Sequence, residues 1–289
     1  MTTIDQNQTA DPTALPPHPR EVGRPLEGVD LREQRPAGPR WRPMLGRLAL
    51  RLSLPVLLLA IWSAVSLSSP NIASVLPPPY RVLASLWHEA VAGPLFLHIG
   101  ASLLRALGGF ALAGSIGVAL GLLMSQSRVV QYLLAGPVEL LRPISSIAWI
   151  PLAILWFGLG YQSVVFVIAI SCIFIVLINT LAAALRIDPD LIKAGLTLGA
   201  GRWTLFRKVI VPNSLPGILL GLRIAMSGAW GGVLVAEMIA TRQGLGYMIL
   251  RAQAAFRPDL VIGGMLVVGV VGYLLNMLFL QLQRRVIHV

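Results

Sequence analysis

Two long runs of this chain contain no charged residue, and each is long enough to cross a lipid bilayer. They are residues 163–185 and 260–282. A helix needs about 20 apolar residues to span the hydrocarbon core. Because a spanning segment must satisfy its own backbone hydrogen bonds, only helices and closed barrels are possible there. Both runs therefore predict membrane-spanning helices.

Four further apolar runs have a similar length but carry a few prolines or charges. We expect spans at about residues 48–68, 99–124, 130–157 and 215–239. The run 130–157 is the most interrupted, because it contains Pro137, Pro143 and Pro151. The sequence thus predicts an all-α fold, a polytopic bundle of about six transmembrane helices.

Composition and charge agree with a membrane protein. Only 12% of the residues are charged, against about 25% in soluble domains, and the mean hydropathy is +0.76. With the N-terminus inside, sixteen of the 23 basic residues fall in cytoplasmic segments and four outside. This bias predicts that both termini are cytoplasmic. The net charge of +11 does not indicate nucleic-acid binding, because no basic face with interleaved aromatic residues accompanies it.

The regions before and between the spans have compositions of their own. Residues 1–45 are rich in Pro, Arg and acidic residues, so we expect a disordered cytoplasmic tail before a membrane domain at 46–289. Residues 70–98 predict a proline turn and a short amphipathic helix on the outer interface, with Val82, Leu86 and Ala90 on one side.

Small residues recur at a spacing of four in two of the expected spans. Such faces allow helices to approach closely in lipid, either inside one bundle or between subunits. Packing inside the bundle is the favoured alternative. The faces are Ala113, Gly117 and Gly121; Gly217, Gly221 and Ala225; and Gly228 with Gly232.

A polar, glycine-rich stretch interrupts the apolar sequence at residues 188–212, and we call it the elbow. Asp188 and Pro189 predict a helix start. Gly199 is placed to end that helix in the left-handed conformation. A second helix is expected after Gly201, with apolar Trp203, Phe206 and Ile210 on one face, and it is expected to stop at Pro212. The apolar face fits three partners: the lipid surface, the protein's own bundle, or a cytoplasmic protein.

The elbow resembles the cytoplasmic signature loop of permease subunits of bacterial ABC importers. That signature reads Glu-Ala-Ala, three residues, Gly, nine residues, then Ile-x-Leu-Pro. The spacing matches throughout, with Lys193 in place of the glutamate and Gly195 in place of the second alanine. The likeness extends over about residues 70–284, with a family-like core from about 95. Further segments that carry it are SLLRALGGFALA (102–113), LRPISSIAWIPLAILWFGLG (141–160) and VLVAEMIATRQGLGYMI (233–249).

The resemblance implies a set of partners. Two copies of the chain would form a homodimer in the cell inner membrane, with two ABC ATPase subunits on the cytoplasmic side and a substrate-binding protein outside. The elbow would be a coupling helix that docks on the ATPase. Its contact residues would be Lys193, Ala194, Gly195, Gly199, Ala200, Trp203, Phe206, Val209 and Pro212.

Ionisable and polar residues inside spans are candidates for the translocation pathway. Arg142 is the foremost, because it stands at the proline-broken third span, although a structural ion pair is the alternative. Arg105 and Arg223 are expected to snorkel or to pair with Glu139 or Glu237. Glu237 and the turn at 244–246 resemble the outer gate of the family; a helix cap and a simple turn are the alternative. The pathway and gate candidates are Arg142, Ser145, Ser146, Glu237, Gly244 and Gly246.

The chain itself is expected to bind no cofactor or metal and to catalyse no reaction. It lacks a G-x-x-x-x-G-K-[ST] phosphate loop, so ATP and Mg would belong to the partner ATPases. The branch resembled imports sulfonates, taurine, nitrate and related solutes, which favours a small anion, with aliphatic sulfonate ahead of nitrate, taurine, bicarbonate or a pyrimidine precursor. An ion-coupled secondary transporter and a membrane enzyme are the alternatives from other classes.

Overall fold

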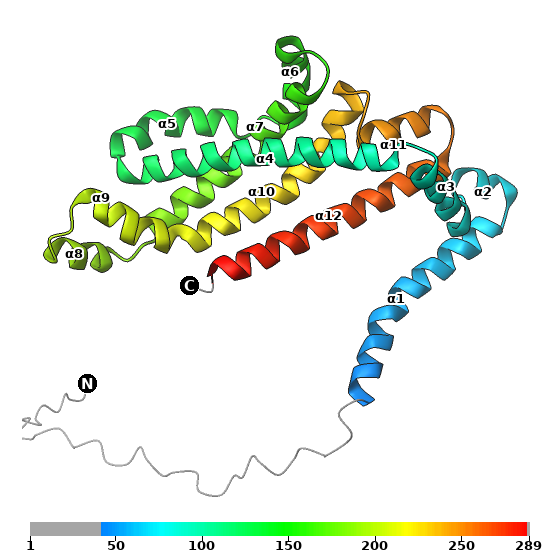
Figure 1. Cartoon of the computed structure of the whole chain (residues 1–289), viewed down its shortest axis with the longest axis horizontal. Coiled ribbons are helices and arrows are strands. Elements are labelled where there is room, and N and C mark those ends of the chain that lie inside the picture. The colour runs from blue at the N-terminus through cyan, green and yellow to red at the C-terminus, as the bar shows by residue number, and fades with distance from the viewer. Residues whose placement is uncertain (1–41, 288–289) are drawn as a thin grey trace, which may run out of the picture. The chain divides into compact units, whose positions relative to one another are not determined.

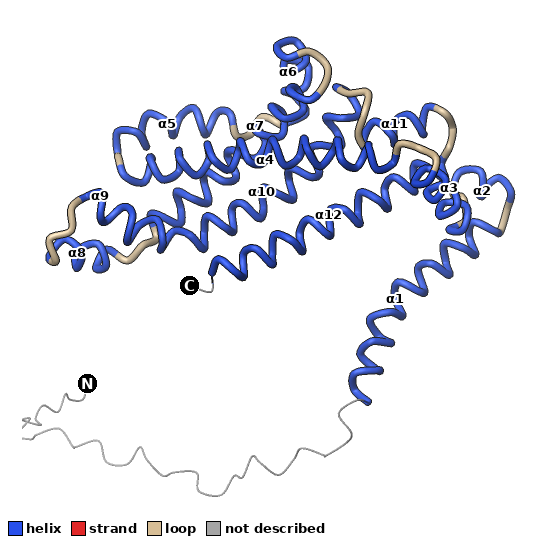
Figure 2. Tube along the Cα trace, in the orientation of Figure 1, coloured by secondary structure: helices blue, strands red, loops and turns tan. Residues whose placement is uncertain are grey.

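The computed structural model describes residues 42–287, and every regular element among them is helical (Figures 1 and 2). The all-α expectation is confirmed. The predicted tail lies outside the described residues, apart from 42–45, which already belong to the first helix. The helices are α1 (Arg42–Leu67), α2 (Pro70–Val75), α3 (Pro79–Val91), α4 (Leu95–Gln126), α5 (Arg128–Leu141), η1 (Ser146–Trp149), α6 (Ile150–Phe157), α7 (Tyr161–Leu185), α8 (Pro189–Thr197), α9 (Arg202–Leu205), η2 (Phe206–Ile210), α10 (Val211–Ala240), α11 (Leu245–Ala254) and α12 (Pro258–Ile287).

Four helical stretches of the described residues are long and apolar enough to cross a membrane, or up to six if each of two bent pairs counts as one span. This agrees with the prediction of about six. The four are Leu95–Gln126, Tyr161–Leu185, Arg202–Ala240 and Pro258–Arg285. The chain divides into two compact units, Met1–Pro55 and Val56–Val289, and the contacts described below all lie within the second.

The expected third span, residues 130–157, is not one straight helix. Its two parts, Arg128–Leu141 and Ser146–Phe157, meet at an angle of 92°. The break falls at Pro143, which has no N–H with which to continue the hydrogen-bond ladder. Pro137 lies inside α5 and Pro151 in the first turn of α6, so neither ends a helix. The first expected span likewise leads into a second segment, with 115° between Ser53–Leu67 and Pro70–Val91.

Helix α7 lies at the centre of the second unit, where α4 and α10 pack against it through small residues. A Cβ on Gly117 would lie 2.9 Å from the carbonyl oxygen of Ile173, and one on Gly121 would lie 2.8 Å from that of Leu177. On α10, a Cβ on Gly221 would lie 2.6 Å from the Cβ of Asn179. The glycine faces of α4 and the first half of α10 therefore serve packing inside the bundle, as the favoured alternative predicts.

Helix α12 packs against both α10 and α3. The indole Nε1 of Trp230 donates to the carbonyl of Val268 over 3.0 Å, which ties α10 to α12. Val82 of α3 is fully buried, and Leu86 fits over Gly263 of α12. The amphipathic helix predicted in 70–98 is present, but its apolar side is covered by protein. Its opposite side exposes Tyr80, Leu83, Trp87 and Val91.

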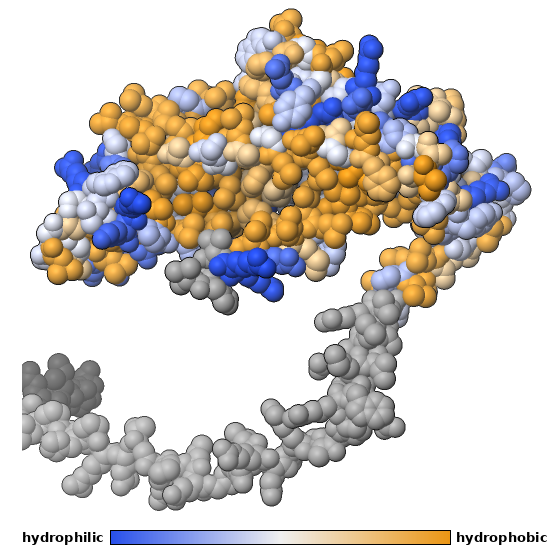
Figure 3. All heavy atoms as spheres, in the orientation of Figure 1, coloured by the Kyte–Doolittle hydropathy of each residue, from blue (hydrophilic) through white to orange (hydrophobic). Residues whose placement is uncertain are grey.

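Hydrophobic side chains dominate the visible outer surface of the bundle (Figure 3). Leu104, Leu123 and Val270 are each more than half exposed. Soluble monomers rarely expose large contiguous apolar patches, so this surface is suited to lipid. Unit Val56–Val289 is thus built as a membrane-embedded bundle around α7.

The packing against α7 leads to a stability prediction. Replacing Gly117 with valine would overpack the α4–α7 contact and lower the free energy of unfolding by about 1–3 kcal/mol. Thermal unfolding of the detergent-solubilised protein measures this. Gly100 is the control, because a Cβ there meets nothing within 4 Å. A Gly117→Val variant as stable as Gly100→Val would contradict the packing role.

Candidate functional site

The first half of the elbow is a short capped helix, as predicted. The Asp188 carboxylate accepts a hydrogen bond from the backbone N–H of Asp190 over 2.9 Å, and Pro189 occupies the first turn of α8. Proline is favoured there because a first-turn N–H has no partner within the helix. Lys193 pairs with Asp190 at 2.9 Å, but both side chains are largely exposed, so the pair adds little stability.

Gly199 ends α8 in the left-handed conformation, which confirms the sequence prediction. Its φ is +79°. The Ala200 N–H donates to the Gly195 carbonyl over 3.0 Å, and the Gly199 N–H donates to the Leu196 carbonyl over 2.9 Å. These two bonds form a Schellman motif, in which glycine at the left-handed position avoids the steric cost of a Cβ.

The two arms of the elbow meet where Gly195 faces Leu205. A Cβ on Gly195 would lie 2.5 Å from the Leu205 side chain, which is buried. Gly195 thus lies at the contact between the two arms. Its position in the family signature alone does not indicate this packing role.

The second arm does not stop at Pro212, contrary to the prediction. The helical path runs without a break from Arg202 to Ala240, 39 residues. The reason is the π turn at Phe206–Ile210, in which the Val211 N–H donates to the Phe206 carbonyl. The wider turn carries the helix up to Pro212, which then stands in the first turn of α10, where a missing N–H is tolerated.

The tip of the elbow exposes large apolar side chains. Leu198 is 87% and Trp203 70% exposed, and the Trp203 ring stacks on Phe206 with 5.6 Å between centroids. Ile210, predicted on the same face, is buried instead, because the π turn rotates it inward. Of the remaining elbow candidates, Ala194 and Pro212 are exposed and Ala200 and Val209 are half-buried.

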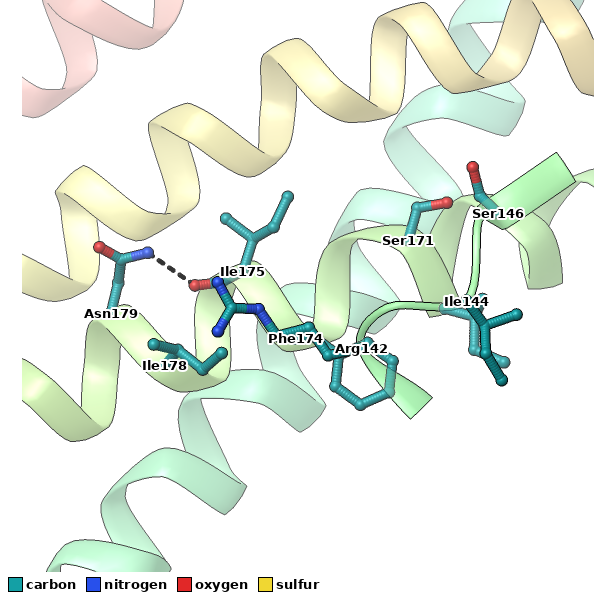
Figure 4. Close-up of a pocket in the computed structure, with 9 residues that line it drawn as sticks. Arg142, Ile144, Ser146, Ser171, Phe174, Ile175, Ile178 and Asn179 are labelled. Carbon is teal, nitrogen blue, oxygen red and sulfur yellow. Dashed lines mark hydrogen bonds between the residues drawn. The ribbon is translucent and has the colours of Figure 1, made fainter. Parts of the chain in front are cut away.

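A cavity of about 350 Å³ opens beside the middle of α7, at the break between α5 and η1, and we call it the Arg142 cavity (Figure 4). Figure 4 shows the guanidinium of Arg142 extending along α7 toward the end that holds Asn179, while Ser146 and Ser171 lie at the other end. Arg142 makes no side-chain hydrogen bond or ion pair with any described residue. The lining residues are Arg142, Ile144, Ser146, Ile170, Ser171, Phe174, Ile175, Ile178 and Asn179.

The polar groups of this cavity differ in what they can still donate. Ser171 gives its hydroxyl proton to the Val167 carbonyl at 2.7 Å, and Asn179 gives one amide proton to the Ile175 carbonyl at 2.8 Å. The guanidinium, the Ser146 hydroxyl and the second Asn179 proton remain for a ligand, which suits an anion. Ser145, the other predicted serine, is exposed and does not line the cavity.

Glu237, near the far end of α10, is fully buried, and three groups hold its carboxylate in what we call the Glu237 network. Arg105 Nη1 donates to its Oε1 over 2.7 Å, Ser102 donates to its Oε2 over 2.7 Å, and the Gly246 N–H donates over 3.1 Å. Arg105 also donates to the carbonyl of Gln243 over 2.8 Å. Of the alternatives expected for Arg105, pairing with Glu237 is the one observed, whereas Arg223 and Glu139 form no ion pair among the described residues.

The two candidate glycines allow the turn between α10 and α11 to close onto this carboxylate. Gly244 has a φ of +122°, and a Cβ on it would overlap the carboxylate of Glu237. A Cβ on Gly246 would overlap the carbonyl of Leu234. The Gly244 N–H donates to Nδ1 of His98 over 3.0 Å, and the Leu245 N–H donates to Ser102 over 2.8 Å. The turn is therefore fixed to α4 by backbone and side-chain bonds.

The sequence reasoning missed Ser102 of the Glu237 network, His98 beside it and one residue of the Arg142 cavity. His98 and Ser102 are four residues apart, with Arg105 one turn further, so they share one face of α4. A polar stripe at helical spacing within an apolar run is a signal that indicates buried partners. Asn179 offered no such signal, because its neighbours from the α5–η1 break and from α10 come together only in the fold.

Comparison with known proteins adds a family match. The profile of the family described as binding-protein-dependent transport system inner membrane component matches residues 113–288. The taurine transport system permease protein TauC of Escherichia coli is 33% identical over 254 residues, 85% of this chain and 92% of that protein. SsuC of Bacillus subtilis, a permease protein named for aliphatic sulfonates, is 33% identical over 236 residues, 82% and 86% of the two chains. The riboflavin transport system permease protein RibX of Chloroflexus aurantiacus is 36% identical over 213 residues, 73% and 80%.

Two solved transporters have the same fold. A chain of a bacterial alginate ABC transporter, in complex with an alginate-bound periplasmic protein, superposes with a TM-score of 0.60 at 16% identity, covering 86% of this chain and 98% of that one. A chain of the methionine ABC transporter MetNI, in an inward-facing conformation, gives 0.59 at 19% identity, covering 68% and 98%. At these identities the likeness establishes the fold alone.

The Glu237 network leads to a second stability prediction. Glu237→Gln removes the charge that pairs with buried Arg105, and we expect a loss of about 3 kcal/mol in the free energy of unfolding. Thermal unfolding in detergent measures the change. Glu139→Gln is the matched control, because Glu139 is exposed and forms no ion pair among the described residues. Equal melting temperatures for the two variants would show that the network does not hold the turn.

Proposed function

Because this chain belongs to the family of binding-protein-dependent transport system inner membrane components, and is a permease subunit of an ABC importer, we propose that it forms the translocation pathway for a small anionic solute. Members of this family are translocation components and not enzymes. The observation that carries the proposal is Arg142, a cation with no described partner, in a cavity beside the middle of a spanning helix. A cationic side chain at that depth is costly unless it faces a polar pathway.

Aliphatic sulfonate is the substrate that we favour. A sulfonate is a fixed anion at physiological pH, so it suits a guanidinium with free N–H groups. Relatives named for taurine and aliphatic sulfonates support this choice. The relative named for riboflavin indicates that sequence likeness in this family does not fix the solute. Nitrate, taurine, bicarbonate and a pyrimidine precursor remain alternatives from the same importer type.

Coupling to two ATPase subunits through the elbow is the second part of the proposal. Exposed Leu198 and Trp203 offer an apolar tip that a groove on a cytoplasmic protein would cover. The ATPases would bind ATP and Mg, and their closure would move the elbow. Because the elbow is continuous with α10, its movement would bias the bundle between inward-open and outward-open states.

A second copy of the chain and an external binding protein complete the proposed assembly. The Arg142 cavity is open on one side, where lipid would be an unsuitable neighbour for a guanidinium, so a homodimer partner is expected to cover it. The binding protein would dock at the outer end, near the α10–α11 turn. The basic residues of the elbow, together with Arg284 and Arg285, support a cytoplasmic position for the elbow and for both termini.

Reconstitution in liposomes with the ATPase and the binding protein tests the function. We expect binding protein loaded with an aliphatic sulfonate to stimulate ATP hydrolysis, and uptake to require ATP. An ion-coupled secondary transporter, the alternative from another class, would instead take up the solute from an ion gradient without the ATPase.

The elbow gives a prediction with a matched pair of glycines. A side chain at Gly199 is strained because its φ is +79°, although a Cβ there meets nothing within 4 Å. The cost is about 1–2 kcal/mol, so we expect Gly199→Val to reduce coupled uptake about tenfold while the chain still inserts. Gly201 is equally open and has a φ of −69°, so Gly201→Val is the control. Full uptake by Gly199→Val would argue against the elbow as the coupling element.

A further inference from the structure

A second cavity, of about 440 Å³, lies between the end of α7 and the elbow, and we call it the elbow cavity. Both cavities fall within the range of volumes that hold small organic ligands. The residues that line it are Asn179, Ala182, Ala183, Arg186, Ile187, Asp188, Leu191, Asn213, Gly217 and Leu220.

Asn179 is the residue that the two cavities share. Its side chain is fixed on α7 by the bond to the Ile175 carbonyl and by contact of its Cβ with Gly221 of α10. One amide proton and the amide oxygen have no other hydrogen bond among the described residues. Asn179 therefore presents a neutral, polar group to both cavities.

The charges along this route favour anions. Arg142 lines the first cavity, and Arg186 lines the second, with no ion pair to any described residue. The one carboxylate in either lining is Asp188, which is exposed at the cytoplasmic end and accepts the N-cap bond of α8. Fixed cationic groups in a cleft raise the local concentration of anions.

We propose that the Arg142 cavity and the elbow cavity are successive stations of one anion route along α7, with Asn179 as the neck between them. Asp188 and Leu191 of the elbow form part of the wall of the second station. Movement of the elbow therefore changes the width of the cytoplasmic station directly. The direction of transport and the force that moves the elbow rest on the proposed function, but the route and its charge preference do not.

The chain's cysteine content makes a direct test possible. Cys172 is the single cysteine of the sequence and is fully buried, so it is silent to polar thiol reagents. In Asn179→Cys, reconstituted as the full-length chain in liposomes, two reagents of opposite charge are compared: 2-sulfonatoethyl and 2-trimethylammonioethyl methanethiosulfonate. Each rate is normalised to that of a free thiol in solution. We expect the sulfonate reagent to be favoured about tenfold.

Three further variants make the labelling experiment decisive. Adding Arg142→Gln to Asn179→Cys should bring the charge preference close to that in solution. Asn71→Cys is the control, because Asn71 is exposed in α2, lines neither cavity and should show no such preference for the sulfonate. Asn213→Cys, in the wall of the elbow cavity, gives the same comparison if Asn179→Cys does not fold. A cysteine at 179 that is unreactive to both reagents, or that prefers the cationic one, would overturn the route.

A transport measurement completes the test in the assembled importer. Asn179→Asp keeps the shape of the side chain and places a negative charge in the neck. We expect uptake of ethanesulfonate to fall about tenfold, while stimulation of ATP hydrolysis by loaded binding protein persists and Asn71→Asp transports normally. Unchanged uptake in Asn179→Asp would refute the neck. Loss of stimulation in the unaltered protein would instead refute the proposed function, and the labelling result would still stand.

Discussion

The close approach of α4 and α10 to α7 is the constraint on which the rest of the structure depends. In lipid, helices gain little from the hydrophobic effect and associate mainly through packing, which small residues make tight. Gly117, Gly121 and Gly221 bring the backbones together with no side chain between them. With three helices held this closely, α7 becomes a fixed wall, and polar groups along it keep defined positions.

The polar groups of the bundle then fall into two kinds with opposite roles. In the Glu237 network, Ser102, Arg105 and the Gly246 N–H all bond to the Glu237 carboxylate, so its charge is compensated. Along the open side of α7, by contrast, Arg142 and Arg186 retain free donors. Compensated charges stabilise the α10–α11 turn, whereas uncompensated ones are available to a ligand, which is the division of roles expected of a permease.

The sequence predicted best those features that local chemistry decides. Asp188, Pro189 and Gly199 act on their own neighbours along the chain, and the cap and the left-handed turn follow from these residues alone. The continuation of the helix through Pro212 was missed, because a π turn has no reliable residue signature. That Asn179 lines two cavities was missed for another reason: segments far apart in the chain form these cavities, and no periodicity within α7 marks the position.

The unbroken helical path from Arg202 to Ala240 also links the orientation of the elbow to the orientation of the Glu237 side chain. At 1.5 Å per residue the α-helical part of this path, the 30 residues of α10, extends about 45 Å, and each of these residues turns the helix by about 100°. The number of residues between Leu205, which packs against Gly195 of the elbow, and Glu237, which anchors the α10–α11 turn, therefore sets the directions in which the two side chains point. The number of residues in this segment is thus as constrained as its composition. One inserted residue would leave both ends chemically intact but would rotate one end about the helix axis relative to the other, so that the two would face incompatible directions.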